Sequence, residues 1–525
     1  MAILARRPLP TTAPTRFRTP PWHDNHPAKR ELEQRLDPDH LARLIDQAVE
    51  RLDLAPLRAL YHGTGSPAHP PERLLRVALF EMRRGHHSPA EWHLHARECE
   101  PVRWLLRGAR VARSCWYAFR DRLAPLLPAL NRQVLAQAVD AGLTPATRAA
   151  ADGTLVAALA SRHKLLNDEA LQRRAAQVAA AVALDAAAAP AATPGGVAAG
   201  AADAPPSPPQ AAAVEPAARP AWLAATAAGR RQQQRRLERA RERLEQLQVL
   251  NRKKWASKRK AAGALVVSPS EPEAVVARDK EKVYRPLYNV QFLDDLDSPL
   301  ILGYGVFAQQ NDTGLLPGML AQARQQIGHG LEVVLADGSY AGGADLAAAD
   351  GAGVAVYAPV PGDGVKNPKQ IPKREFAWQA AERTYVCPQG HRLKLEESWR
   401  ERRVDGGVQV WRYRCDPLHC QGCPQQARCT KTPAKGRAVT RLEHEELIEA
   451  LRARMAGEEA QALYRLRKQT VELVNADVKQ HRKLRRFSGR GLARAECEVG
   501  LVVLVHNLLT LVSEEPKAGR PQRSP

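Results

Sequence analysis

The stretch LEVVLADGSYAGGADL, residues 331–346, contains the feature on which the fold prediction depends. Its apolar run, Val333, Val334 and Leu335, predicts a short buried strand, because aliphatic and β-branched residues favour that environment. Asp337 stands where this run stops, immediately before a glycine-rich turn. An aspartate in that position is commonly a turn former or a helix N-cap. The alternative is a metal ligand held on a rigid sheet, and the rest of the chain must decide between the two.

The composition points to a nucleic-acid partner. The chain has 525 residues, which is long enough for several domains with a substantial core. It contains 78 Lys and Arg against 56 Asp and Glu, a formal net charge of +22. The basic residues recur from Arg6 to Arg523, so a single basic tail does not account for the surplus. A surplus of this size on a soluble chain makes nucleic acid the first partner to consider.

The apolar runs predict no membrane span. None reaches the roughly 18 to 20 residues that cross a bilayer, and the longest candidate, 499–512, is interrupted by His506 and Asn507 and predicts a buried helix. The first residues carry two arginines before any sustained apolar stretch, unlike a secretory signal. We therefore expect a cytoplasmic protein that does not associate with membranes. Its eight cysteines are then expected to be thiols or metal ligands rather than disulfides.

The N-terminal part of the chain is predicted to be helical. Residues 1–29 are rich in Pro, Arg and Thr and predict a flexible arm. From 30 to 145 the apolar residues recur at helical spacing, with Asp39 and Ser88 where N-caps belong. This indicates an all-α N-terminal domain. A DNA-binding helix-turn-helix and an ordinary set of amphipathic basic helices remain equally open.

The middle of the chain changes composition twice. Residues 146–177 begin the core of a second block, and residues 178–228 form an Ala/Pro tract that cannot bury a core and predicts a flexible linker. Residues 229–262 are strongly basic, and one helix face there carries Leu237, Ala240, Leu244 and Leu247. A coiled-coil or helical-hairpin arm, a DNA-contacting helix and a solvated basic helix all remain open.

The rest of the chain is predicted to be α/β. Residues 263–372 continue the core, with a hairpin through the LDDLDS turn, a helix and further strands. Residues 373–440 are rich in cysteine and form a small insertion. Residues 441–512 contain no proline and predict C-terminal helices of the core, and residues 513–525 predict a disordered tail.

Three acids stand out in these patterns. Asp152 lies in AADGTLVAA, Asp337 ends its strand, and Glu472 lies on a predicted basic helix. On that helix Lys468 lies one turn before Glu472 and Lys479 two turns after it, on the same face. Two divalent ions roughly 3.5–4 Å apart can activate an attacking oxygen and stabilise a leaving one in phosphodiester chemistry. Because Mg²⁺ prefers oxygen ligands and keeps some waters, two or three carboxylates suffice to bind it.

These residues resemble those of a known family. Four segments, 150–164, 270–291, 333–340 and 463–511, resemble in order the first-aspartate, Tyr-Asn-x-Gln, second-aspartate and third-acid segments of bacterial insertion-sequence DDE transposases. The N-terminal helical block, through WLLRGARVARSCWYAFRDRL, resembles the N-terminal domain of the same family. The nearest subgroup is the eleven-eighty-two type, which carries a cysteine-bearing insertion between the second and third acids. The resemblance covers most of the chain outside the Ala/Pro tract and both termini.

The resemblance implies a fold and a site. The fold is an α/β RNase H-like catalytic core, a mixed five-stranded sheet flanked by helices, with an all-α N-terminal domain and a small Cys-rich insertion. Asp152 would lie on the first strand, Asp337 after the fourth and Glu472 on a late helix. These acids would be catalytic and hold two Mg²⁺ or Mn²⁺ ions. The same helix would bind DNA through Tyr464, Arg465, Arg467, Lys468 and Lys479.

The resemblance also implies a reaction and a partner. The enzyme would bind double-stranded DNA at the terminal inverted repeats of its element, cut it and join the freed ends to target DNA. It would act as a homodimer on DNA in the bacterial cytoplasm, associated with the nucleoid.

Several residues depart from the family pattern. The second motif reads Asp-Gly-Ser-Tyr where Asp-Ala-Gly-Tyr is usual, Leu473 replaces a proline, and NADVK replaces a Phe-Gly-containing run. Leu155 and Leu159 stand where Lys and Asn are usual. The acids themselves are intact. A decayed or repurposed transposase that binds DNA without cutting it is therefore an alternative, and an RNase H-like nuclease without strand transfer is a third.

The cysteines predict a structural zinc site. Cys420 and Cys423 form a C-x-x-C knuckle, and Cys429 and Cys387 complete a tetrahedral set. His391 and Cys415 are further candidates, and unligated thiols in a loop-rich insertion are the alternative. Such an insertion has little core of its own, which favours a metal staple. The remaining cysteines, Cys99, Cys115 and Cys497, lie in helical patterns and are expected to pack in cores.

With Asp152 and Glu472 identified, Asp337 is better interpreted as the middle acid of a three-carboxylate metal site than as a turn residue alone.

Overall fold

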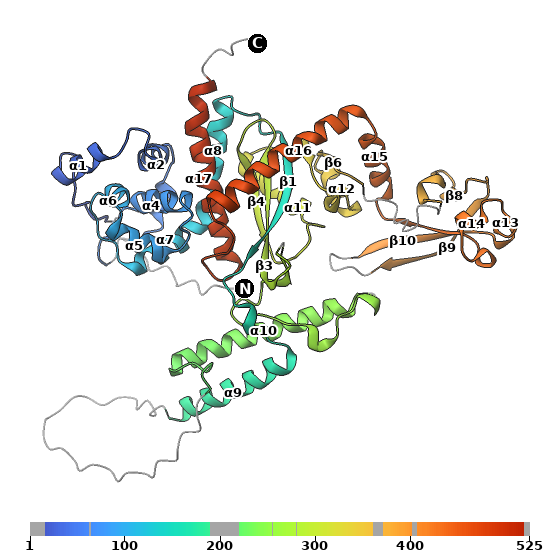
Figure 1. The fold of residues 1–525 in the computed structure, drawn as a ribbon, viewed down its shortest axis with the longest axis horizontal. Coiled ribbons are helices and arrows are strands. Elements are labelled where there is room, and N and C mark those ends of the chain that lie inside the picture. Colours follow the sequence, from blue (N-terminus) through green and yellow to red (C-terminus); the bar gives the residue numbers. More distant parts are fainter. Residues whose placement is uncertain are drawn as a thin grey trace, which may run out of the picture. The chain divides into compact units, whose positions relative to one another are not determined.

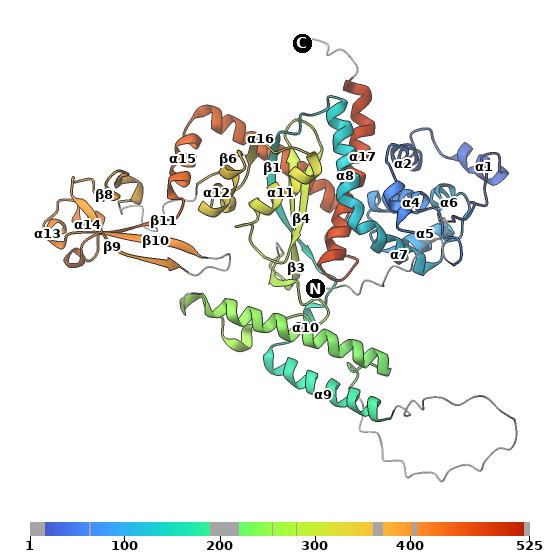
Figure 2. The same ribbon diagram turned by 180° about the vertical axis from the view of Figure 1, so that it is seen from behind.

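The computed structural model describes residues 16–61, 65–188, 220–254, 256–279, 281–360, 371–401 and 407–518. It divides into two compact units. The main unit comprises Met1–Leu159 and Ala277–Pro525, and the inserted unit comprises Ala160–Val276. The ribbon is shown from two sides in Figures 1 and 2.

The N-terminal part of the main unit is helical, as predicted. Its helices are α1 (Pro27–Arg35), α2 (Leu41–Glu50), α3 (Ala55–Ala59), α4 (Pro71–Arg83), α5 (Pro89–Glu98), α6 (Glu100–Leu105), α7 (Arg113–Leu123), η1 (Ala124–Leu126) and α8 (Leu127–Asp140). Ser88 caps α5 in a capping box with Glu91, which confirms one predicted cap. The predicted N-cap at Asp39 is wrong. Helix α2 begins one residue later than expected, and the ring of His40 accepts the hydrogen bond from the Ala42 N–H.

The predicted N-terminal arm is fixed in its second half. The Arg18 N–H donates to the Ala68 carbonyl at 2.8 Å, and the Trp22 N–H donates to the Arg107 carbonyl at 3.0 Å. Helix α1 then begins before the predicted boundary at residue 29. These backbone bonds hold the arm against the helices, whereas residues 1–15 lie outside the described part of the chain.

The centre of the main unit is a mixed sheet. Its strands are β1 (Arg148–Ala157), β2 (Val275–Arg278), β3 (Tyr284–Asp295), β4 (Ile301–Phe307), β5 (Val333–Leu335) and β6 (Ala355–Tyr357). The order is β2-β3-β1-β5-β6, with β4 also paired to β3. The described sheet thus has six strands where five were expected, because the short β2 adds to β3. The predicted hairpin through LDDLDS is confirmed by the antiparallel pairing of β3 with β4.

The register of this sheet brings two predicted acids together. Strand β1 runs antiparallel to β3, with Asp152 opposite Phe292. It runs parallel to β5, and the last pair is Ala150 with Leu335. Asp152 and Asp337 therefore both lie two residues beyond the same pair, on neighbouring strands that run in the same direction.

Helices pack around this sheet. They are α11 (Leu316–Ile327), η5 (Gly338–Tyr340), α12 (Gly343–Gly351), α15 (Glu445–Met455), α16 (Glu458–Ala476), the π-helical turn η8 (Asp477–His481) and α17 (Leu492–Ala518). Helix α16 lies against β1, where Val471 packs on Ala150 and Leu335. Figures 1 and 2 both show α17 beside α8.

Helix α17 is a buried core helix. Its segment Leu492–Glu514 has a mean hydropathy of 1.6 and is long and apolar enough to cross a membrane, but 72% of the relevant window is buried within the protein. It contacts α8, α4 and β4, which supply the apolar surroundings. The predicted buried helix at 499–512 is therefore confirmed. The helix also continues to Ala518, past the predicted start of a disordered tail at 513.

The cysteine-bearing segment forms a second sheet. Its elements are η6 (Lys373–Glu375), β7 (Ala377–Gln379), β8 (Thr384–Val386), β9 (Arg392–Glu401), β10 (Val408–Cys415), α13 (Pro417–Cys420), α14 (Gln426–Cys429), η7 (Pro433–Lys435) and β11 (Ala438–Leu442). The strand order is β11-β10-β9-β8-β7. The expectation of a loop-rich segment with little core is wrong. The rings of Trp378, Tyr385 and Tyr413 contact one another at centroid distances of 4.8–5.5 Å and form a core with Leu393 and Val439.

The inserted unit is a helical hairpin. Its elements are η2 (Arg162–Lys164), α9 (Asp168–Ala187), α10 (Ala227–Arg252), η3 (Ala256–Lys258) and η4 (Ala262–Ala264). Arg230, near the start of α10, bonds to Asp185, near the end of α9, at 2.6 Å, so the helices are antiparallel. Leu237, Ala240 and Leu244 are buried against Leu171 and Val178, as the predicted helix face requires.

This hairpin changes two predicted boundaries. Helix α9 continues to Ala187, past the predicted start of the linker at 178, because its alanines favour helix and Val178 packs on α10. The remainder of the predicted linker lies mostly outside the described residues. Residues 160–177, which were assigned to the core, belong to the inserted unit.

Candidate active site

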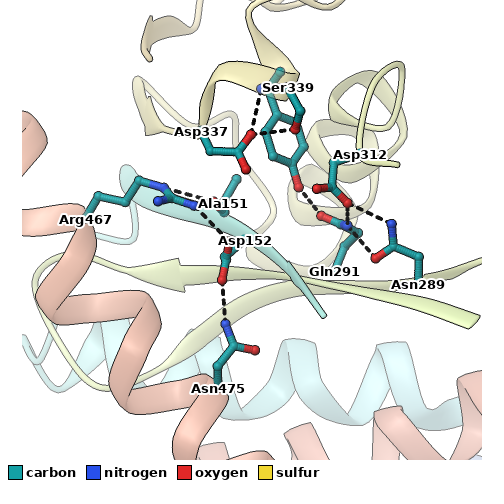
Figure 3. A network of polar contacts seen from close by, with 10 residues as sticks. Ala151, Asp152, Asn289, Gln291, Asp312, Asp337, Ser339, Arg467 and Asn475 are labelled. Atoms are coloured by element: carbon teal, nitrogen blue, oxygen red, sulfur yellow. Dashed lines mark hydrogen bonds and ion pairs between the residues drawn. The ribbon is translucent and has the colours of Figure 1, made fainter. Parts of the chain in front are cut away.

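Asp152 lies in the middle of β1 and is held by two side chains of α16. The Arg467 guanidinium donates to Asp152 Oδ1 at 2.8 Å, and the Asn475 amide donates to Oδ2 at 2.7 Å. Arg467 also donates to the Ala151 carbonyl at 3.2 Å. Figure 3 shows Arg467 and Asn475 reaching Asp152 from the same helix. Both carboxylate oxygens of Asp152 are therefore engaged by α16.

The surroundings of Asp152 favour a positive charge. Burial raises the pKa of the Asp152 carboxyl, and the carboxylates of Asp337 and Asp312 add to that rise. The Arg467 guanidinium and the Gly153 N–H oppose it. Because partial burial and like charges both disfavour the ionised form, a cation beside Asp152 stabilises this group of acids.

Asp337 does act as a turn residue. It is the N-cap of η5, and its Oδ1 accepts from the Ser339 N–H at 2.7 Å and from the Ser339 hydroxyl. Among the described residues its other oxygen has no hydrogen-bond partner. Asp337 can therefore be both a turn residue and a metal ligand, because one carboxylate oxygen bonds to the turn and the other is available to bind a cation.

Glu472 is exposed on α16, at the edge of a cavity of about 540 Å³ that Asp152 also lines. The cavity is lined by the acids Asp152, Asp279, Glu281 and Glu472 and the cations Arg285, Arg467, Lys468, Lys479 and Arg485, with apolar and amide side chains between them. Asp337 does not line it. Within the described residues, the oxygens of the three predicted acids do not all lie within 4.8 Å of one another.

The five predicted DNA-binding residues do not share one surface. Arg467, Lys468 and Lys479 line the cavity. Tyr464 is half-buried nearby: burial raises its pKa, the Arg467 guanidinium lowers it, and the Asp337 and Asp152 carboxylates raise it. Arg465 is exposed and does not line the cavity. Lys479 lies in the π-helical turn η8 rather than in a regular helix, and such turns are frequent at functional sites.

Comparisons with known families match two separate parts of the chain. A family described as "Transposase DDE domain" matches residues 386–512, which include α16 and Glu472. A family described as "Transposase domain (DUF772)" matches residues 30–122. Two regions of the chain therefore match transposase families, and the C-terminal one matches a DDE domain. No curated protein and no solved structure matches it. The matched regions contain neither Asp152 nor Asp337.

A hydrogen-bonded network beside β1 explains the glycine of the Asp-Gly-Thr motif. Asp312 Oδ1 accepts from the Asn289 amide at 2.7 Å and from the Gln291 amide at 2.6 Å (Figure 3). A Cβ on Gly153 would lie 2.2 Å from Gln291 Nε2 and 2.7 Å from Asp312 Oδ1. Any side chain at Gly153 would therefore displace this network from beside Asp152. Asp312 was missed in the sequence, although the alternation of Asn289 and Gln291 on β3 indicated a polar face.

Asn475 was also missed. It lies three residues after Glu472 and therefore on the same face of α16, where it contacts Asp152. The sequence showed NADVK only as a departure from the family pattern. Helical spacing from Glu472 was the signal that could have identified Asn475.

A further acid, Asp294 on β3, lies near Asp152 but is fully enclosed. Its side chain is 1% exposed, and neither carboxylate oxygen has a hydrogen-bond partner. Burial raises the pKa of Asp294 well above its ordinary value, and the Asp152 charge adds to the effect. No predicted role accounts for Asp294.

The cysteines surround a second, much smaller cavity. It has a volume of about 20 Å³ and is lined by Cys387, Cys415, Cys420, Cys423 and Cys429 together with His391 and His419. All four predicted zinc ligands are thus brought to one place, with the two further candidates. Burial and the neighbouring Cys420 raise the pKa of Cys415 to about 12, and burial raises that of Cys429. Among the described residues, no three of these ligand atoms lie within 4.8 Å of one another.

Proposed function

We propose that this transposase cuts DNA at the ends of its element and joins the freed ends to target DNA, with Asp152, Asp337 and Glu472 as the metal-binding acids of an RNase H-like core. The observation that carries the proposal is the position of Asp152. It lies on a central strand, beside the end of the parallel strand that Asp337 follows. It also lines the same cavity as Glu472 among several cations.

The donor set fits divalent cations of the Mg²⁺ or Mn²⁺ type, because carboxylate oxygens are the ligands these ions prefer. Two such ions would supply activation of the attacking oxygen and stabilisation of the leaving oxygen in an in-line displacement. The raised pKa of Asp152 supports this assignment, since a cation would relieve the repulsion from Asp337 and Asp312. Asp152 would have to exchange Arg467 and Asn475 for the cation.

The chain's own residues would then bind and orient DNA. Released from Asp152, the Arg467 guanidinium has the planar donors that suit a phosphate. Lys468 and Lys479 line the same cavity and would neutralise neighbouring phosphates. The Asp312 network would keep β1 in position, because it packs directly on Gly153.

We propose double-stranded DNA as the partner, bound by a homodimer in the bacterial cytoplasm. The net charge of +22 supports a polyanionic partner. So does a basic segment at the end of α10, where Arg252, Lys253, Lys254, Lys258, Arg259 and Lys260 are exposed. Asn251 clamps this segment through two bonds to the Lys260 backbone, at 2.7 and 3.0 Å. The dimer rests on the family resemblance.

We also propose a structural Zn²⁺ in the cysteine cavity, held by Cys387, Cys420, Cys423 and Cys429. The soft thiol donors and the shared cavity support it. Binding would draw the sulfurs closer together and displace their protons. Cys415 and His391 line the same cavity and are the alternative ligands.

A DNA-binding protein without cleavage activity is the second candidate. The observation that favours it is the engagement of both Asp152 oxygens by Arg467 and Asn475. In such a protein that arrangement would be permanent.

One experiment separates the two. The purified chain is incubated with a duplex that carries the DNA flanking its coding sequence, with Mg²⁺, Mn²⁺ or chelator. We expect metal-dependent nicking at the element ends that is lost in Asp337→Ala, and joined strands when target DNA is added. Binding without cleavage in the intact chain would contradict the proposal, and cleavage without joined products would indicate a nuclease.

A further inference from the structure

We infer that Glu81, His86 and His95 form a transition-metal site in the N-terminal helices, of the kind that binds Zn²⁺. Among the described residues they are the group of possible ligands whose donor atoms all lie within 4.8 Å of one another. The site is separate from the acids of the cavity and from the cysteines, and it does not rest on the proposed function.

The three side chains come from two helices and the turn between them. Glu81 lies on α4, His86 in the turn and His95 on α5. His95 Nδ1 lies 2.6 Å from a Glu81 oxygen, and the rings of His86 and His95 are 4.6 Å apart at their centroids. With zinc bonds of about 2.0–2.1 Å, tetrahedral ligand atoms stand roughly 3.3–3.5 Å apart. Small side-chain movements would therefore bring the group to coordination distance.

The burial of Glu81 gives an independent indication of a ligand. Its side chain is 0% exposed, and Oε1 has no hydrogen-bond partner. The nearest cation, Arg84, lies 3.9 Å from that oxygen, which is too far for a hydrogen bond. A buried carboxylate oxygen without a partner is costly. A bound cation would satisfy it.

The backbone fixes the ligands before any metal binds. Gly85 has φ +79°, a conformation that favours glycine, and turns the chain directly after α4. The His86 N–H donates to the Glu81 carbonyl at 2.9 Å, and the Trp92 indole donates to the His86 carbonyl at 2.8 Å. The capping box of Ser88 then begins α5 and sets the position of His95. Little conformational freedom is left to lose on binding.

The donor set selects the kind of metal. Two imidazoles and one carboxylate suit Zn²⁺ and similar transition metals and not Mg²⁺, which prefers an all-oxygen site. His86 and His95 are half-buried, so solvent reaches one side of the group and a water can take a fourth position. The metal would tie α4 to α5 within the region that matches the DUF772 transposase domain.

Zinc binding to the full chain tests the site. The variants are Glu81→Gln and His95→Asn, and the matched control is His93→Asn. His93 is half-buried on the same helix, outside the group, with one contact to the Val111 carbonyl at 3.1 Å. Each protein is dialysed against a small excess of Zn²⁺ and its metal content is measured. Zinc at the cysteines is common to all four proteins and cancels in the comparison.

We expect the wild type and His93→Asn to hold one more zinc ion per chain than Glu81→Gln and His95→Asn. Equal zinc content in all four folded proteins would overturn the inference and leave a buried Glu–His ion pair. Because Glu81→Gln changes a buried group, His86→Asn at the more accessible edge provides a second measurement. Added Zn²⁺ should raise the melting temperature of the wild type by more than that of His86→Asn, and equal rises would also overturn it.

Discussion

The acid site on β1 and the cysteine cavity of the second sheet hold their candidate ligands in different ways. Asp152, Asp337 and Glu472 come from segments far apart in the chain. The Asp152 carboxylate is paired with the Arg467 guanidinium and accepts a hydrogen bond from the Asn475 amide. The cysteines come from one short segment and lie against the apolar core of their sheet. Burial raises the pKa of Cys415 and Cys429, so these thiols are neutral without a metal.

This difference determines what a metal must displace. At the acid site a cation competes with a guanidinium and an amide, so binding is coupled to a movement of side chains on α16. At the cysteines a metal competes with protons, so binding is coupled to pH and to the stability of the sheet. We therefore expect changes at the first site to alter chemistry and changes at the second to alter stability.

Removing one ligand from each site is the strongest test of whether the acid site determines chemistry and the cysteine cavity determines stability. Asp152→Asn should lower the Mg²⁺-dependent nicking rate on the order of 10³-fold, because several kcal/mol of charge stabilisation are lost. Cys423→Ser should retain the wild-type rate at temperatures where it remains folded. Initial rates on the same duplex measure both, and a Cys423→Ser loss as large as that of Asp152→Asn would remove the distinction.

Removal of zinc should lower the stability of the protein through the cysteine cavity. With zinc a thousand-fold above its Kd, binding contributes about 4 kcal/mol to folding. A chelator should therefore lower the melting temperature of the wild type and of Cys99→Ser, a control outside the cavity, by more than that of Cys423→Ser. Identical melting temperatures of the wild type with and without chelator would contradict a zinc site at the cysteines.

The role of Asn475 sharpens the account of the acid site. Asn475→Ala removes the side chain that orients Asp152, and losses of supporting contacts at metal sites typically cost about 10- to 100-fold in affinity. The Mn²⁺ concentration that gives half-maximal nicking should rise by that factor. Gln480→Ala, on the wall of the same cavity, is the control and should leave it unchanged. If both variants behave alike, the bond to Asp152 has no part in metal binding.

The buried Asp294 predicts a pH dependence of stability. Its pKa is raised in the folded protein, so its contribution is fully present below the unfolded value of about 3.9 and is lost as the pH rises through the folded value. The free energy of unfolding of the wild type should therefore fall relative to that of Asp294→Asn as the pH is raised above the unfolded value of about 3.9. Denaturant unfolding across this range measures the difference, and a constant difference would mean that Asp294 does not take up a proton on folding.

The smallest expected effect separates two basic residues of α16. Lys468 lines the cavity and Arg465 does not. Lys468→Ala should lower the salt dependence of DNA binding by about one unit of slope, as expected for one lost phosphate contact. Arg465→Ala should change it less. Equal slopes for the two variants would place the DNA on a different face of α16.

The sequence predicted most of the architecture because it depends on local patterns. The β3–β4 hairpin, the cap at Ser88 and the gathering of the cysteines follow from spacing and turn residues close together in the chain. The helical hairpin of the inserted unit was one of several alternatives, because the pairing of α9 with α10 depends on contacts across a long intervening segment. The core of the second sheet was missed because its aromatic residues are spread over several strands.

The candidate site was less predictable than the fold. The positions of Asp152 and Glu472 on one cavity follow from motif order, but the partners of Asp152 do not. The roles of Asn475 and Asp312 and the raised pKa of Asp294 depend on how α16 and β3 pack against β1, which no local pattern specifies. Asp337 shows the same limit, since the sequence could not reveal that one oxygen serves the turn and the other is available.

The central claim is that Asp152, Asp337 and Glu472 form one divalent-metal site. Anomalous diffraction from crystals of the protein bound to DNA in Mn²⁺ tests it most directly. The account predicts manganese peaks between Asp152 and Asp337, with Glu472 turned toward them and the bonds from Arg467 and Asn475 to Asp152 broken. Manganese absent from that position, with Asp152 still bonded to Arg467 and Asn475, would contradict it.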